Sequence, residues 1–263
     1  MAAVAQRRLI LIPPSEGKEL GGEGPPWAEA RGDHPLASRR REVIAALGPA
    51  LRNRAAAARL LGARGDTLER FVEADLAVDS AATLPAIQRY TGVLYQHLDA
   101  AALDRRSRTR LGRTVRIFSG LWGVVAPDEW IPDYRLKMSA SLPGPGKLST
   151  WWRGPVSDLL AAEAKGAEVW NLLPREHAAA WQAPPGVVEC RATFLQPGPK
   201  GTLVAVSHWN KALKGSLVAH LVAHPTASID DLCDWDHPAG YRLDPHSIEA
   251  VDGVRALRFV TTG

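Results

Sequence analysis

Three positively charged side chains follow short apolar runs that are typical of buried strands. Lys18 comes after the first run, Arg135 after one in the middle of the chain, and Lys211 after one near the end. In open α/β sheets, ligands bind beyond the carboxyl ends of the strands, and arginine holds a phosphate or carboxylate with two parallel hydrogen bonds. We therefore expect the three residues to converge on one concave, solvent-accessible site for an anion.

The loop that carries Lys18 reads PPSEGK over residues 13–18. Backbone N–H groups and one ammonium group directly after a strand are suited to cradle an anion. The G-x-x-x-x-G-K-[ST] pattern of phosphate-binding loops is not met, because Ile12 and Glu19 replace its first glycine and its hydroxyl residue. The loop thus indicates anion binding without a nucleotide-specific motif.

Residues 118–135, FSGLWGVVAPDEWIPDYR, form the segment that is densest in candidate residues. If the site belongs to an enzyme, Arg135 would clamp the anion and Tyr134 would move a proton. Lys18 or Lys211 would then stabilise the negative charge that develops. The alternative is a purely structural role, in which the segment is a tight turn fixed by prolines and Arg135 forms an ion pair. The residues do not decide between the enzyme site and this structural role.

A helix predicted at residues 209–223 begins with a cluster of positive charge. Ser207, Lys211 and Lys214 share one of its faces, so the two lysines reinforce one positive spot. Lysines in a first turn face the positive end of the helix dipole, which is unfavourable unless an anion docks there. The alternative is that both lysines extend into solvent.

Three more polar residues at or beyond predicted strand ends are expected to line the same site. They are Ser119, Asn171 and Glu176. The tandem tryptophans Trp151 and Trp152 precede an arginine, and such rings can stack on nucleic-acid bases. We assign Trp152 to base stacking, although a pair of this kind more often contributes at least one ring to the core.

The charge distribution favours an anionic partner more than the net charge does. The 263 residues carry a formal net charge of +4, from 32 Lys and Arg against 28 Asp and Glu. Residues 105–116 hold six arginines and no acid, and residues 190–229 hold no acid at all. DNA, a nucleotide or a phosphorylated metabolite fits this segregation; solvated faces are the alternative. For DNA, the expected contacts include Arg105, Arg106 and Arg108.

Composition excludes several classes of protein. With 46% hydrophobic and 23% charged residues, the chain is neither disordered, collagen-like nor a coiled coil. Two cysteines cannot make a disulfide framework, and no run of ~18 apolar residues is present to span a membrane. We predict a soluble, cytoplasmic protein without cofactor or stable protein partner. His220 and His224 lack the further ligands of a metal site, so no metal is predicted.

The pattern of apolar residues predicts a mixed α/β fold: one compact domain over residues 1–263, with a mixed central sheet, flanking helices and a positively charged cleft. Strands are expected at 8–13, 114–118, 168–172, 186–194 and 203–206, with a final hairpin at 247–260. Helices are expected at 35–62, broken at Gly48-Pro49, and at 67–74, 92–103, 148–164 and 209–223. In the helix at 148–164, Gly154-Pro155 is expected to cause a kink or a restart. Residues 20–35 are expected to form an irregular loop.

A series of motifs along the chain resembles the peroxide-stress YaaA family of bacterial proteins. The most specific is FSGLWGVVAPDEWIPDYRLKM at residues 118–138, and others are LILIPPSEGK, VWNLLPREH, VSHWNKALKG and AGYRLD. The resemblance runs from Leu9 to about Asp244. It departs from the family's pattern at Asp133, where a proline is usual, and at Lys214, where an arginine is usual. The first loop also differs, since the family's usual run is Ser-Pro-Ala-Lys-Thr.

The resemblance implies a single mixed α/β domain with a positively charged cleft, affinity for DNA and a role in limiting oxidative damage. Family members are also linked to lower free iron under peroxide. Residues 36–62 are only weakly similar to a helix-hairpin-helix DNA module, because Gly48-Pro49-Ala50 lacks the second glycine. The expected function is therefore that of a DNA-binding peroxide-stress protein. The alternative is an enzyme that acts on a small anionic or nucleotide-like substrate.

Overall fold

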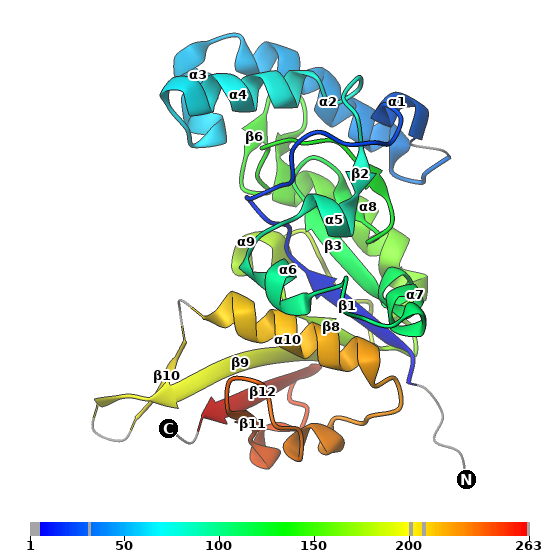
Figure 1. Ribbon diagram of the computed structural model, residues 1–263, viewed down its shortest axis with the longest axis vertical. Coiled ribbons are helices and arrows are strands. Elements are labelled where there is room, and N and C mark those ends of the chain that lie inside the picture. Colours follow the sequence, from blue (N-terminus) through cyan, green and yellow to red (C-terminus); the bar gives the residue numbers. More distant parts are fainter. Residues whose placement is uncertain (1–5, 31–32, 200–201, 207–208, 262–263) are drawn as a thin grey trace.

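A mixed β-sheet forms the centre of the computed structural model, which describes residues 6–30, 33–199, 202–206 and 209–261 (Figure 1). Its strands are β1 (Arg8–Ile12), β3 (Val115–Ser119), β4 (Gly123–Val125), β8 (Glu168–Asn171), β9 (Glu189–Pro197), β10 (Leu203–Ala205), β11 (Tyr241–Leu243) and β12 (Val254–Thr261). Their order is β11-β12-β9-β8-β1-β3-β4, and β10 pairs with β9. Two small ladders join β2 (Leu84–Pro85) to β5 (Trp130–Ile131) and β6 (Ser141–Leu142) to β7 (Gly146–Lys147). The predicted mixed α/β fold is confirmed.

The central strand β1 is buried along its whole length, as expected for a strand covered on both faces. It pairs in parallel with β3 on one side, where Ile12 is level with Ile117, and with β8 on the other, where Leu11 is level with Asn171. The carboxyl ends of three parallel strands therefore lie along one edge of the sheet.

The helices cover the sheet and extend one end of the molecule. They are α1 (Trp27–Ala30), α2 (Ala37–Leu51), α3 (Arg54–Leu61), α4 (Gly65–Leu76), α5 (Ala86–Arg89), α6 (Val93–Leu98), α7 (Arg105–Thr114), α8 (Leu148–Ala164), α9 (Arg175–Ala178) and α10 (Asn210–Ala223), with 3-10 turns at Asp230–Cys233 and Pro245–Ser247. Figure 1 shows α2, α3 and α4 together at one end and α10 beside β9 at the other. Within the described residues, no helix combines the length and apolar content needed to cross a membrane.

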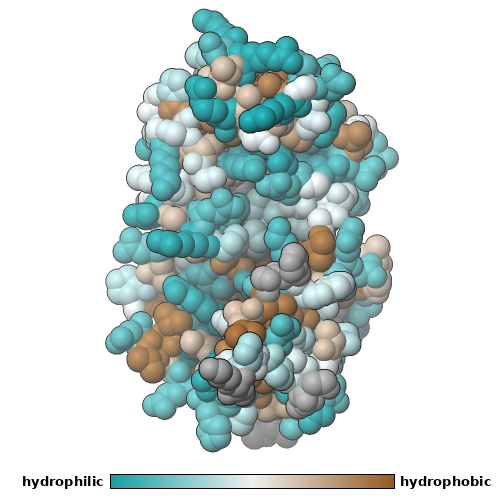
Figure 2. Space-filling model, turned by 90° about the vertical axis from the view of Figure 1, so that its left-hand side faces the viewer, coloured by the Kyte–Doolittle hydropathy of each residue, from teal (hydrophilic) through white to brown (hydrophobic). Residues whose placement is uncertain are grey.

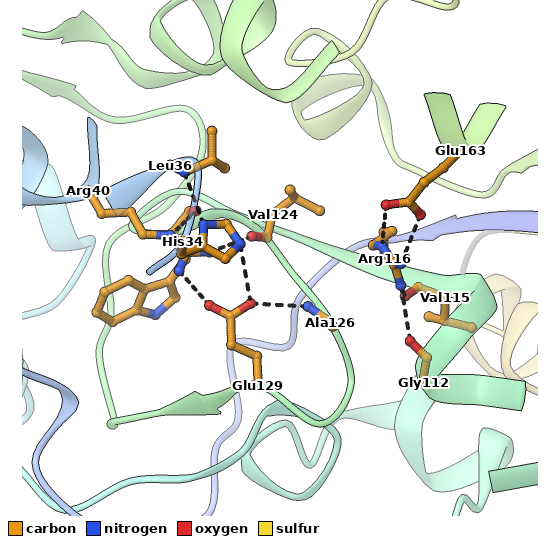
Figure 3. Close-up of polar contacts among 11 residues, drawn as sticks. His34, Leu36, Arg40, Gly112, Val115, Arg116, Val124, Ala126, Glu129 and Glu163 are labelled. Carbon is orange, nitrogen blue, oxygen red and sulfur yellow. Dashed lines mark hydrogen bonds and ion pairs between the residues drawn. The ribbon is translucent and has the colours of Figure 1, made fainter. Parts of the chain in front are cut away.

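A buried arginine anchors α2 to the sheet. The Arg40 side chain is fully buried, and it donates from Nε to the Trp122 carbonyl oxygen at 3.0 Å and from Nη2 to the Val124 carbonyl oxygen at 2.7 Å. Its Nη1 forms an ion pair with Glu129, whose other oxygen faces His34 at 4.0 Å (Figure 3). These contacts hold the turn between β3 and β4 against the helical end of the molecule.

The turn after β3 requires glycine at its first position. A Cβ atom on Gly120 would lie 2.4 Å from the carbonyl carbon of Lys137, a distance at which backbone must move. The absence of a side chain therefore lets residues 137–138 pack directly on the turn. This close approach places the segment that follows Tyr134 next to the carboxyl end of β3.

The predicted break at Gly48-Pro49 does not occur, and the helix does not restart at Gly154-Pro155. The helix α2 continues through Gly48 and Pro49, and α8 continues through Pro155, although a proline inside a helix removes one backbone hydrogen bond. Each helix buries an apolar face on both sides of its proline, and in α8 this face includes Trp152 and Leu160. Packing of that face outweighs the lost hydrogen bond.

Other predicted elements differ in position or partner. A glycine hairpin between helices occurs at Gly62 and Gly65, between α3 and α4, where φ is 66° and 55°, and not at Gly48-Pro49. The predicted loop at 20–35 includes the short α1, and the helix predicted at 92–103 ends at Leu98. The predicted final hairpin is wrong, because β12 pairs antiparallel with β11 and parallel with β9.

The surface is mostly hydrophilic on the face shown in Figure 2, where apolar residues gather in the lower half. The edge strand β10 carries two exposed apolar side chains, Leu203 and Val204. Edge strands of this kind have unpaired backbone groups on one side.

The hydrophobic core is a single cluster that extends through β1, β3, β8 and the helices packed on them.

Candidate anion-binding site

A cavity of about 320 Å³ lies beyond the carboxyl ends of β1 and β8. Its wall consists of residues 13–18 after β1, 92–95 at the start of α6, 134–138, residues 174, 176 and 177 around α9, and Lys211 of α10. Segments that are far apart in the sequence thus meet at the edge where the parallel strands end. Small-molecule sites usually form at this place in α/β sheets.

Four cationic side chains line this cavity. The three that the sequence predicted to converge, Lys18, Arg135 and Lys211, all contribute to it. The fourth, Lys137, was not predicted, although its position two residues after Arg135 indicates that it shares the same site. Residues i and i+2 of an extended segment lie on the same side of the backbone, so this lysine accompanies Arg135 into the cavity.

Two of these cations, Arg135 and Lys137, form ion pairs with Glu16, a residue of the loop that carries Lys18. Glu16 Oε2 lies 2.8 Å from Arg135 Nη2, and Glu16 Oε1 lies 3.0 Å from Lys137 Nζ. Burial works to raise the pKa of Glu16, but the hydrogen bonds from Lys137 and Arg135 outweigh it and lower the pKa. The Glu16 side chain is 64% exposed, whereas that of Arg135 is 12% exposed. An external anion can therefore displace the Glu16 carboxylate while the Arg135 guanidinium stays in place.

Two residues of helix α4, Asp75 and Phe71, position Arg135. Asp75 Oδ1 accepts a hydrogen bond from the Arg135 backbone N–H at 2.6 Å, and the guanidinium lies 4.7 Å from the ring centre of Phe71. Among the described residues, Asp75 Oδ2 and Arg135 Nε are both buried without a hydrogen-bond partner. Burial raises the pKa of Asp75 to about 6, against the lowering effect of the Arg135 N–H group. Asp75 was not predicted as a site residue, and no sequence pattern singles it out.

Lys18 is half-buried and lies against two tyrosine rings. Its Nζ donates to the Ser15 carbonyl oxygen at 3.0 Å and lies 4.4 Å from the ring centre of Tyr134 and 5.6 Å from that of Tyr90. Burial lowers the pKa of Lys18 to about 8. Among the described residues, no carboxylate lies within ion-pair distance of it.

A chain of hydroxyl groups runs beneath Lys18. The Tyr134 hydroxyl lies 2.7 Å from both Ser119 Oγ and the Tyr90 hydroxyl, and Ser119 Oγ also accepts from the Trp122 backbone N–H at 3.1 Å. Burial raises the pKa of Tyr134 and Tyr90, so both hydroxyls keep their protons. The face of the Tyr134 ring, and not its hydroxyl, is turned towards Lys18.

Comparison with known proteins agrees with this arrangement of motifs. A family model described as peroxide stress protein YaaA matches residues 9–247 of this chain. The chain belongs to the YaaA family of peroxide stress proteins. The resemblance seen in the sequence is thereby confirmed.

Curated relatives of this YaaA-family protein include three chains named UPF0246 protein. That of Streptomyces coelicolor is 37% identical over 220 residues, which cover 83% of this chain and 84% of the relative. That of Corynebacterium efficiens is 35% identical over 246 residues, covering 90% and 94%. One of Corynebacterium glutamicum is 33% identical over 214 residues, covering 80% and 82%.

Some predicted residues of the YaaA-family protein lie elsewhere. Lys214 and Asn171 line a second cavity of about 830 Å³. There Lys214 Nζ donates to the Leu172 carbonyl oxygen at 3.1 Å, and Asn171 Nδ2 donates to the buried carboxylate of Glu189 at 2.9 Å. Lys211 and Lys214 therefore do not reinforce one positive spot. Ser207, assigned to the same helix face, lies outside the described residues.

Glu176 lines the anion cavity beside His177, whereas Ser119 lies fully buried below it. Trp152 is also fully buried and donates from Nε1 to the Gly120 carbonyl oxygen at 2.8 Å. A ring without exposed surface cannot stack on a base, so the assignment of Trp152 to nucleic-acid binding is wrong. Its role is to pack under the glycine turn, where a Cβ atom on Gly123 would lie 2.7 Å from the indole.

The arginine-rich segment forms α7 and the first residues of β3, and none of its residues lines the anion cavity. Arg105, Arg106 and Arg108 are exposed there, and Arg108 lines a third cavity, of about 1030 Å³. Two other arginines of the segment are engaged. Arg110 donates to the Val222 carbonyl oxygen, and Arg116 lies 2.8 Å from Glu163 (Figure 3).

Thiol and metal chemistry find little support in the described residues. Burial raises the pKa of Cys190 to about 12 and also raises that of Cys233. A peroxide-reactive cysteine needs the opposite, a lowered pKa that yields thiolate. No group of three or more His, Cys, Asp or Glu side chains that could hold a metal ion lies in the described ranges.

Proposed function

We propose that this YaaA-family protein serves the response to peroxide stress by binding a small ligand through its phosphate or carboxylate group. The site is the cavity lined by Lys18, Arg135, Lys137 and Lys211. The observation that carries the proposal is the Glu16 carboxylate, which bridges Arg135 and Lys137 as an external anion would. An exposed internal carboxylate in this position shows how these cations can hold a negative group.

The size of the cavity favours a small ligand. Small-molecule sites span roughly 300–1,000 Å³, and this one, at about 320 Å³, lies at the lower limit. Its four cations face two carboxylates, those of Glu16 and Glu176, which leaves an excess of positive charge. A compact phosphorylated or carboxylated metabolite satisfies both constraints better than a whole nucleotide.

Calorimetric titration of the protein with inorganic phosphate tests the proposal. We expect saturable binding of one phosphate per chain that weakens as salt is added, because partly exposed cations are screened. Acetate, which resembles the Glu16 carboxylate, should compete with phosphate. The absence of saturable binding by either anion would contradict the proposal.

DNA binding is the second candidate, and exposed arginines on α7 favour it. Among the described residues, Arg105 and Arg106 form no ion pair, and the Arg108 side chain donates only to the Ala101 carbonyl oxygen, at 3.2 Å. The acid-free stretch at 190–229 contributes less than its composition indicates. Within it, Arg191 is paired with Glu189 at 2.5 Å and Lys214 is half-buried.

Salt dependence provides the test of the DNA candidate. If α7 contacts duplex DNA, the log–log plot of affinity against salt should have a slope of about −0.9 for each phosphate neutralised. A triple variant with alanine at 105, 106 and 108 should flatten that slope by about three contacts and weaken all sequences alike. The control Arg242→Ala removes an arginine that is already paired with Asp236 and should change little. A triple variant that binds as well as the wild type would refute this role for α7.

A further inference from the structure

Lys18 is an amine in an unusual position within the cavity. It lines the cavity together with three other cations, and two aromatic rings lie against it. Among the described residues, its Nζ has one hydrogen-bond partner, the Ser15 carbonyl oxygen. Lysines placed in this way lose the water and the counter-ions that stabilise an ammonium group. The binding of a simple anion is served by Arg135 and Lys137 without any need for such an amine.

We propose that Lys18 is a nucleophile that forms an imine with a small aldehyde or ketone carrying a phosphate or carboxylate group. The inference rests on the proposed function, because Arg135 and Lys137 would hold the anionic group of the same molecule. In the reaction, the uncharged Nζ forms a bond to the carbonyl carbon. The carbonyl oxygen leaves as water with the two N–H protons of the amine, so the step needs no oxidant or reductant.

The groups around Lys18 support this chemistry. The pKa of Lys18 is lowered to about 8, because burial and the charge of Arg135 outweigh the opposite effect of Asp133, Asp75 and Glu16. At pH 7.5 a lysine of this kind holds about two hundredfold more uncharged amine than a lysine in water.

Reductive trapping tests the inference on the wild-type protein. The probes are glyoxylate, which carries a carboxylate, and pyridoxal 5′-phosphate, which carries a phosphate, each with sodium cyanoborohydride to reduce any imine to a stable secondary amine. Peptide mass mapping then reports which lysines are modified. We expect Lys18 to react with these probes at least about tenfold faster than Lys165, which is exposed at the end of α8. Arg135 and Lys137 would hold the anionic group of the probe beside Lys18, and more of the Lys18 amine is uncharged. The preferred probe tells which anion the site takes.

Three comparisons test whether the labelling is specific to Lys18 and to probes that carry an anionic group. Lys18→Arg should lose the preferred adduct, whereas the matched change Lys165→Arg should leave it in place. Propanal, an aldehyde without charge, should label Lys18 with a much smaller preference than the anionic probes, because only the uncharged amine favours it. Inorganic phosphate should protect Lys18 from either anionic probe. Labelling of Lys18 should accelerate as the pH rises through about 8 and then level off, because the ammonium form loses its proton there.

Each outcome bears on the proposal. Equal labelling of Lys18 and Lys165 in the folded wild type would overturn it, and so would preferential labelling that propanal reproduces. If phosphate binds in calorimetry while Lys18 stays unmodified, the covalent step fails and the anion site stands. If Lys18 is labelled preferentially while phosphate does not bind, the proposed function fails instead.

Discussion

Replacing Arg135 with alanine should weaken phosphate binding by about a hundredfold, the loss expected for a charge-assisted pair of hydrogen bonds. The guanidinium is held by its packing on Phe71 and by the backbone bond to Asp75, so little ordering is needed when a ligand arrives. Without it, Lys18, Lys137 and Lys211 remain as separate charges. Calorimetric titration of wild type and variant at one low salt concentration measures the change.

Two further variants define what Arg135 does. Arg135→Lys keeps the charge but loses the planar fork, and we expect a loss of about tenfold. Glu16→Gln removes the internal competitor and should strengthen binding about three- to tenfold, the scale of an exposed ion pair. Wild-type affinity in Arg135→Ala would place the anion elsewhere. Weaker binding by Glu16→Gln would mean that Glu16 takes part in holding the ligand.

The Arg40→Ala variant should lose about 3–5 kcal/mol of unfolding free energy, as expected when one partner of a buried ion pair is removed. The Glu129 carboxylate and the carbonyl oxygens of Trp122 and Val124 would lose their donor, and a cavity would replace a fully buried side chain. Equilibrium denaturation in urea measures the difference.

A surface pair provides the control for Arg40. Arg54 lies 2.7 Å from Glu69, and both side chains are more than half exposed, so Arg54→Ala should cost less than about 1 kcal/mol. Equal losses in the two variants would show that Arg40 does not anchor α2 to β4. Because the turn after β3 depends on that anchor, we also expect Arg40→Ala to weaken phosphate binding at temperatures where it remains folded.

Local pattern was sufficient for much of the fold. The apolar run at the start of the chain predicted β1, and the helix predicted at 148–164 has the bounds of α8. Both signals act within a few residues, through alternation or through the 3.6-residue period of a buried face. The break predicted at Pro49 was wrong, and the helix does not restart at Pro155, because the proline rule is also local, whereas the packing that overrides it comes from distant parts of the chain.

For the site, the sequence by itself determined which residues could do chemistry: cations after strands, a glycine turn and the motifs of the YaaA family. Only the tertiary structure decided how they are partnered. Lys211 and Lys214 are neighbours on one helix, yet they line different cavities. Asp75 gives no sequence signal, yet its burial in α4 places an unpaired oxygen near Arg135. Electrostatic interactions depend on distance and on exclusion of water, and neither is set until the parallel strands bring separate segments together.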